Sequence, residues 1–154
     1  MIRIFFASLI VSGVVFGDQT GKVYEADYAL LDLKGIHFIQ GRDKAGKYLN
    51  KVFNDPWFKK NYNIKKPLII REESNSKLTS AIGPTVANGN GTISVPDRGC
   101  FNFNILHEVA HHIKPQGAHE KEFTKMYLIL IDHFVNPEAA NELRKSFKRL
   151  GVQY

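Results

Sequence analysis

Two histidines and a glutamate in the segment ILHEVAHHI (Ile105–Ile113) have the types and spacing of a metal site. His107, Glu108 and His111 form the pattern H-E-x-x-H, and residues four apart lie one helical turn apart, where two imidazoles can reach one ion. Neutral imidazole nitrogen suits zinc. Glu108 is rotated about 100° from His107, which favours a residue that acts on a water molecule beside the metal. The pattern predicts His107 and His111 as zinc ligands and Glu108 as general base.

A catalytic zinc site also needs a third protein ligand, with the fourth position open for water. We favour His119, because Pro115 ends the motif helix and Gly117 allows the chain to reverse toward the two histidines. Three carboxylates farther along the chain are rival ligands, namely Glu122, Glu138 and Glu142. Two interpretations without catalysis also stay open: the motif histidines are polar residues exposed on a helix, or the zinc is structural.

The chain has one cysteine, Cys100, just before the motif helix. A single cysteine excludes an intramolecular disulfide and a zinc site of four cysteines. Cys100 could be a spare ligand or a reactive thiol, but we interpret it as a small, half-buried apolar residue.

The apolar pattern of the chain predicts an α+β fold. Helices and a small antiparallel sheet come before the H-E-x-x-H helix, and two C-terminal helices follow it. Helical spacing covers Lys22–Leu33, Lys44–Phe53, Phe101–Ile113, His119–Phe134 and Pro137–Leu150, the last of these capped by Asn136. Extended segments cover Ile36–Ile39, Pro67–Arg71 and a hairpin of Leu78–Ala87 with Thr92–Val95.

Residues 1–17 differ from the rest of the chain. Arg3 is their only charge, and an apolar run over Ile4–Phe16 is followed by small residues that suit cleavage before Asp18. The run is short for a bilayer span. We therefore predict a signal peptide, a single domain over 18–154, and secretion or export to the periplasm. If the segment is instead a buried strand or an upstream start, the protein is cytoplasmic.

The net charge of +6 is not spread evenly: the largest basic cluster lies between Arg42 and Lys66, and a second one consists of Arg144, Lys145, Lys148 and Arg149. Only Asp43 and Asp55 oppose the basic residues of the first cluster, which are Arg42, Lys44, Lys47, Lys51, Lys59, Lys60, Lys65 and Lys66. Such a cluster indicates solvated helix faces, or a surface that attracts nucleic acid, anionic lipid or an acidic protein. The sequence carries no specific nucleic-acid motif. We expect a peptide or protein substrate, no stable membrane span and a monomer.

Five segments resemble a family of small bacterial and phage metallohydrolases: GKVYEAD (Gly21–Asp27), GTISVPDRG (Gly91–Gly99), HEVAHHI (His107–Ile113), AHEKEF (Ala118–Phe123) and NPEAANELRKSFKRLGV (Asn136–Val152). The motif, turn and third histidine are also similar to the minimal SprT-like zinc peptidases. In both groups the third histidine tends to be followed by glycine and, three residues farther on, by an aromatic residue. Phe123 keeps the aromatic position, whereas Glu120 replaces the glycine.

The resemblance implies a minimal zincin-like domain in which His107, His111 and His119 bind zinc and Glu108 is the general base. It implies a zinc-dependent hydrolase, with a metallopeptidase as the leading expectation. One alternative is a non-catalytic, zinc-containing binding protein. Another is a SprT-like protease that acts on proteins bound to nucleic acid, which the basic segment allows.

Two further expectations concern the substrate. By analogy with zinc peptidases, the strand Thr92–Val95 would lie at the edge of the cleft and pair with an extended peptide. The group that stabilises the transition state is one of four residues that the sequence does not rank, namely Tyr48, Tyr62, Tyr127 and His133.

Overall fold

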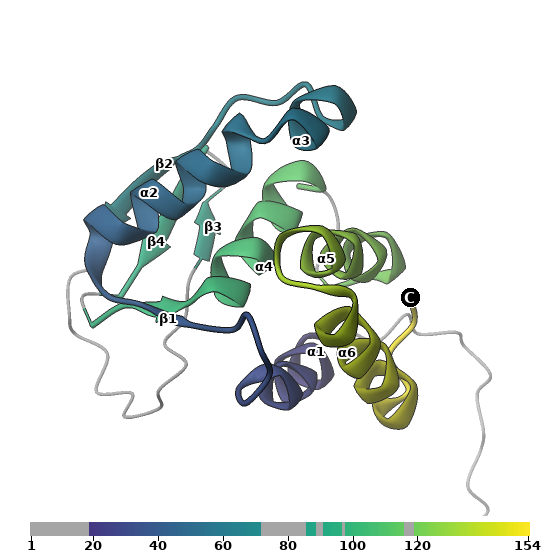
Figure 1. The fold of residues 1–154 in the computed structure, drawn as a ribbon. Helices are drawn as coiled ribbons and strands as arrows, with labels where there is room; N and C mark the ends of the chain where they lie inside the picture. The colour runs from purple at the N-terminus through teal and green to yellow at the C-terminus, as the bar shows by residue number, and fades with distance from the viewer. Residues whose placement is uncertain (1–18, 72–85, 89–90, 97, 116–118) are drawn as a thin grey trace, which may run out of the picture.

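The computed structural model describes residues 19–71, 86–88, 91–96, 98–115 and 119–154 (Figure 1). The signal peptide predicted for 1–17 therefore lies outside the described residues, as do Gly117 and residues 78–85 of the predicted hairpin. The described elements are α1 (Thr20–Asp27) with a 3-10 turn (Tyr28–Leu30), β1 (Phe38–Ile39), α2 (Gly41–Asn54), α3 (Pro56–Asn61), β2 (Leu68–Arg71), β3 (Val86–Asn88), β4 (Thr92–Val95), β5 (Cys100–Phe101), α4 (Asn102–Ile113), α5 (Lys121–Phe134) and α6 (Pro137–Leu150).

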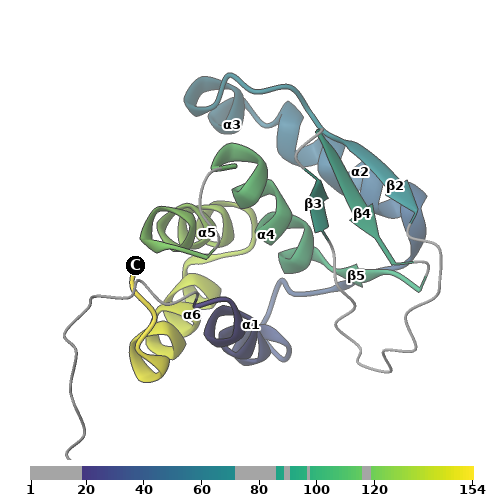
Figure 2. The same cartoon turned by 180° about the vertical axis from the view of Figure 1, so that it is seen from behind.

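The predicted α+β class and order of elements are confirmed. α4 carries the H-E-x-x-H motif and lies between two layers (Figures 1 and 2). On one side are the three-stranded sheet and α2, and on the other are α5 and α6, with α1 packed against α6. No helix in the described parts of the chain combines the length and the apolar character that crossing a bilayer requires.

The prediction of a wholly antiparallel sheet is wrong. The strand order is β2-β4-β3, in which β3 and β4 form the expected hairpin pairing but β2 runs parallel to β4. Alternation of polar and apolar residues identifies an extended segment but not the strand that pairs with it. β2 and β3 are separated by residues 72–85, a connection long enough for another strand to lie between them. β4 is therefore paired on both sides, so the expectation that Thr92–Val95 pairs with an extended peptide is also wrong.

Three other details of the helices differ from the prediction. The first helix ends at Asp27, and α5 begins at Lys121 rather than at His119. A short helix that was not predicted, α3, begins at Pro56, because Asp55 accepts a hydrogen bond from Phe58 N at 3.1 Å and thereby caps it.

The start of α4 is held in place by β5, the strand that directly precedes it. β1 and β5 pair antiparallel, with Ile39 opposite Cys100. Gly99 has φ +104°, and a Cβ at this position would clash with the Ile39 carbonyl, so only glycine lets the strands approach here. Asn102 Nδ2 donates to Gly35 O at 2.9 Å, which ties the first turn of α4 to the segment before β1.

α4 is buried on all sides over most of its length, since every residue from Asn102 to Ala110 is buried. The sequence pattern predicts an apolar face toward the core and histidines on the opposite face. His107 and Glu108 are instead only 1 % and 2 % exposed, because α1 and α5 cover the polar face as well. The interpretation of the motif histidines as an exposed pair is therefore wrong.

The C-terminal helix α6 and the residues after it connect α1 with α5. Asn136 caps α6 as predicted, accepting a hydrogen bond from Ala139 N at 2.8 Å. Beyond α6, the Gln153 carbonyl accepts from Thr124 Oγ1 of α5 at 2.6 Å, and Gln153 N donates to the Gln19 side chain at 2.9 Å. These bonds place the start of α1 beside the start of α5.

Candidate metal centre

Three histidine nitrogens converge at the end of α4. His119 Nε2 lies 2.8 Å from His107 Nε2 and 3.2 Å from His111 Nε2. All three ligand atoms lie within 4.8 Å of one another, close enough to bind one metal ion. The structure thus brings together the three histidines that the sequence predicts, and His119 reaches the site from the turn between α4 and α5.

The rival carboxylates do not join this group. Glu122 is exposed and pairs with Lys125 at 3.2 Å. Glu142 pairs with Lys145 at 2.6 Å, and Glu138 is exposed at the start of α6. Among the described residues, only the three histidines form such a cluster.

The donor set fits a metal ion. In a tetrahedral zinc site with Zn–N distances of about 2.0–2.1 Å, two ligand nitrogens lie about 3.3 Å apart, near the separations that His119 makes here. His107 and His119 are almost fully buried. Nitrogen lone pairs that face each other in such a place repel, so the convergence requires either a proton on one of the Nε2 atoms or a cation among them.

Aromatic rings pack around the three imidazoles. The Tyr24 ring is stacked on His107, with centroids 5.2 Å apart and 14° between planes, and it also contacts His119 at 5.3 Å. Phe123 is stacked on His111 at 4.2 Å, so the aromatic residue singled out in the sequence does form part of the site. These contacts limit the motion of each imidazole.

A buried carboxylate lies behind His107. Asp27 Oδ1 accepts a hydrogen bond from Tyr127 Oη at 2.8 Å, and Asp27 Oδ2 lies 3.7 Å from His107 Nδ1. Behind His119, Thr20 Oγ1 lies 2.8 Å from the ring Nδ1. Both partners come from α1, and both face the nitrogen that points away from the cluster.

Burial sets the protonation of these groups. It lowers the pKa of His107 well below its usual value and that of His111 to about 4, and the neighbouring charge on His119 adds to both effects. Burial also raises the pKa of Asp27 to about 8, against the lowering effect of the Tyr127 hydrogen bond. Two of the three proposed ligands are therefore neutral at pH 7, the form in which imidazole binds metal.

The metal-free protein is expected to be most stable near neutral pH. Between about pH 4 and 6.5 the unfolded chain binds protons on His107 and His111 that the folded chain does not, so stability falls as the pH is lowered. Asp27 acts in the opposite sense, since the folded chain keeps this proton up to about pH 8, and its contribution is lost as the pH rises. Two imidazoles outweigh one carboxyl below pH 6.5.

Urea unfolding in the presence of a chelator, repeated from about pH 5 to about pH 8, measures this dependence. His111→Gln should make the acidic side of the profile shallower, and Asp27→Asn should remove the decline on the alkaline side. A free energy of unfolding that does not change over this range would contradict the assignment.

Glu108 is buried beside this cluster. Burial raises the pKa values of Tyr24, Asp27 and Cys100, and the nearby charge of Glu108 raises all three further. Cys100 is fully buried rather than half-buried, and burial together with this charge raises its pKa to about 12. The thiol is therefore neither reactive nor part of the cluster of possible ligands.

Most of the residues that the sequence suggests for stabilising a transition state lie elsewhere. His133 is stacked on Trp57 and bonds to Asp55 at 3.1 Å, and Tyr62 packs in the same aromatic group. Tyr127 contacts His107, but its hydroxyl bonds to Asp27. Tyr24, which lies over two of the histidines, has no distinguishing signal in the sequence beyond its place in GKVYEAD.

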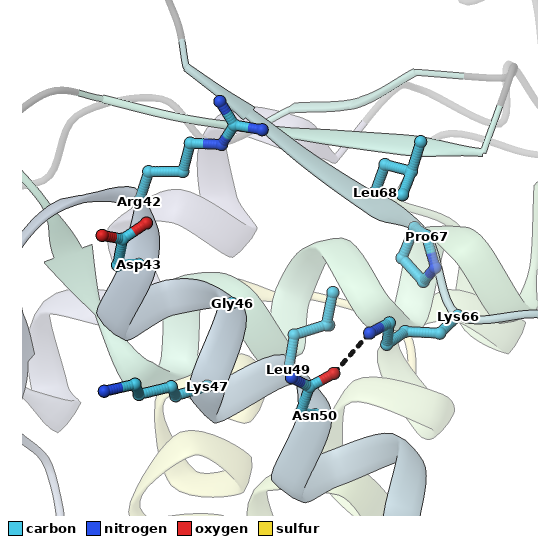
Figure 3. A pocket seen from close by; sticks show the side chains of 9 residues that line it. All are labelled: Arg42, Asp43, Gly46, Lys47, Leu49, Asn50, Lys66, Pro67 and Leu68. Carbon is cyan, nitrogen blue, oxygen red and sulfur yellow. Dashed lines mark hydrogen bonds between the residues drawn. The ribbon is translucent and has the colours of Figure 1, made fainter.

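A basic groove lies apart from these histidines. It has a volume of about 410 Å³ and lies between α2 and the start of β2; its lining residues are Arg42, Asp43, Gly46, Lys47, Leu49, Asn50, Lys66, Pro67 and Leu68 (Figure 3). The Lys66 amine donates to Asn50 across it. A second pocket of about 410 Å³ shares Asn50 and Lys66 and extends toward α3. His112 bonds to the Lys65 carbonyl at 2.7 Å, which joins this segment to α4.

The chain matches no protein-family model, no curated protein and no solved structure. The resemblance of the five segments therefore stays a prediction, and the function must be inferred from the geometry of the three histidines and Glu108.

Proposed function

We propose that this protein is a zinc-dependent hydrolase, and that its substrate is a peptide or protein. One observation carries the proposal: three buried or half-buried histidines converge through Nε2, and the residue after the first of them is a buried glutamate. A purely structural zinc site closes all four positions with protein ligands, whereas three nitrogen ligands leave one position for water. Among the described residues, no fourth histidine, cysteine, aspartate or glutamate joins the group.

The residues have separate roles in this proposal. His107, His111 and His119 hold the zinc, which when bound polarises the substrate carbonyl and makes water more acidic. Glu108 accepts a proton from the attacking water and transfers it to the leaving amine. Tyr24 is stacked on His107 and covers one side of the site. The exposed fraction of this residue is 38 %.

Removal of the metal should abolish hydrolysis. The full chain would be treated with a chelator, dialysed, and assayed on unfolded casein before and after addition of one equivalent of zinc. Cleavage that stops on chelation and returns with zinc is expected, and His112→Gln, which alters a histidine outside the cluster, should behave as the unaltered chain does. Cleavage that persists in the fully metal-free protein would contradict the proposal.

The basic groove supports a second candidate, a zinc protease that acts on proteins bound to nucleic acid. Three cations and one carboxylate line the groove, and all four of these side chains are exposed. Phosphate contacts weaken with added salt as counterions are released. Single-stranded DNA should therefore bind in a gel shift that weakens steeply with salt, and Lys47→Glu with Lys66→Glu should abolish it. Lys145→Glu with Lys148→Glu, on the exposed side of α6, is the matched control, because it also reverses two charges; equal loss there would indicate only a general charge effect.

A further inference from the structure

We propose that α1 is the positioning element of the metal centre, and that Thr20 and Asp27 keep the Nε2 atoms of His119 and His107 free to bind. The inference rests on the proposed function, because it concerns the same metal. It assigns roles to Thr20 and Asp27, to which the sequence analysis gives none.

One face of α1 lies against His107 and His119. Thr20, Tyr24 and Asp27 are four and then three residues apart, so at about 100° per residue their side chains fall within about 60° of one another. Thr20 lies behind His119, Asp27 lies behind His107, and the Tyr24 ring between them contacts both imidazoles. A single helix thus contacts two of the three proposed ligands.

The chemistry of imidazole explains why these contacts matter. A neutral ring carries one proton, and a ring that binds metal through Nε2 must carry that proton on Nδ1. A hydrogen-bond acceptor behind Nδ1 therefore favours the tautomer that binds metal, and it also fixes the orientation of the ring. Asp27 Oδ2 and Thr20 Oγ1 are oxygen atoms placed behind the two Nδ1 atoms, and each can accept a hydrogen bond from Nδ1–H.

Asp27 and His107 each have one buried atom without a hydrogen-bond partner. Asp27 Oδ2 and His107 Nδ1 are both buried, lie 3.7 Å apart, and make no hydrogen bond in the described structure. A buried polar atom without a partner is unfavourable, and a small rotation of the His107 ring would satisfy both atoms. Tyr127 holds the other carboxylate oxygen at 2.8 Å, so the carboxylate is already aimed at the ring.

His119 is held from two directions. Its Nδ1 lies 2.8 Å from Thr20 Oγ1, and its carbonyl accepts a hydrogen bond from Gln19 Nε2 at 2.6 Å. The main chain and the ring of the third ligand are therefore both attached to the start of α1. This attachment explains how a histidine outside a helix can hold a defined place in the cluster.

The test compares zinc affinity among variants of the full chain by competition with a chromophoric chelator. Asp27→Asn and Thr20→Val keep the shapes of the side chains, and each should weaken zinc binding about 10- to 100-fold. Thr20→Ser keeps the hydroxyl and should restore normal affinity, and Asp32→Asn, an exposed aspartate past α1, should leave affinity unchanged. Urea unfolding of each metal-free variant separates a loss of affinity from a loss of fold.

The outcomes distinguish this inference from the proposed function. If the unaltered chain binds no zinc, the proposed function itself fails. If it binds zinc and Asp27→Asn and Thr20→Val bind equally tightly, the role of α1 is overturned while the zinc site stands. If Asp27→Asn does not fold, the comparison of Thr20→Val with Thr20→Ser still tests the inference. Weaker zinc binding by Thr20→Val alone, with unchanged stability of the metal-free protein, supports it. Equal zinc affinity of the two variants overturns it.

Discussion

Glu108→Gln is expected to retain zinc and to lose hydrolysis by about 10²- to 10⁴-fold, the contribution typical of a general base. Glutamine has nearly the same shape as glutamate, so the packing of this buried residue is preserved. It has no basic oxygen that could take the proton from water. The measurement is the rate of casein cleavage at equal zinc content, with zinc determined by mass spectrometry on the same samples.

The matched control for this variant is Glu122→Gln, which makes the same chemical change at an exposed position of α5. It should retain both zinc and activity. Glu108→Gln with unchanged turnover would remove Glu108 as the base and return the search to other groups near the histidines. Loss of zinc together with activity would instead show that the Glu108 charge helps to hold the metal.

His119→Ala is expected to reduce zinc from about one equivalent per chain to almost none, as is His107→Ala. Loss of a residue that hydrogen-bonds to a ligand weakens metal binding about 10- to 100-fold. Loss of a ligand itself should weaken zinc binding further, because one of three protein–metal bonds disappears. The measurement is bound zinc after dialysis against a weak chelator. The controls are Glu122→Ala and Glu142→Ala, which remove rival carboxylates and should keep the metal.

Zinc that survives His119→Ala but not His107→Ala would contradict His119 as the third ligand. Zinc absent from the unaltered chain, even after reconstitution, would favour a non-catalytic binding protein that does not contain zinc. Because His119 is buried, the metal-free variant must also be checked for folding, so that a lost ligand is not confused with a collapsed site.

The sequence alone is informative where chemistry depends on local spacing. The four-residue separation of His107 and His111 holds in any α-helix, so it survives whatever surrounds that helix. The cap at Asn136 and the antiparallel pairing of β3 with β4 are likewise local, and both agree with the prediction over the described residues. His119 could be proposed because only a short turn separates it from the motif.

The tertiary structure decided everything that depends on segments distant in the chain. β2 pairs with β4, which lies more than twenty residues farther along the chain, and no local pattern records which strand becomes the neighbour. The burial of Glu108 depends on α1 and α5 closing over the polar face of α4, which its own periodicity assigns to solvent. Asp27 meets His107 across eighty residues of chain, so a contact of this kind is visible only once the helices are packed.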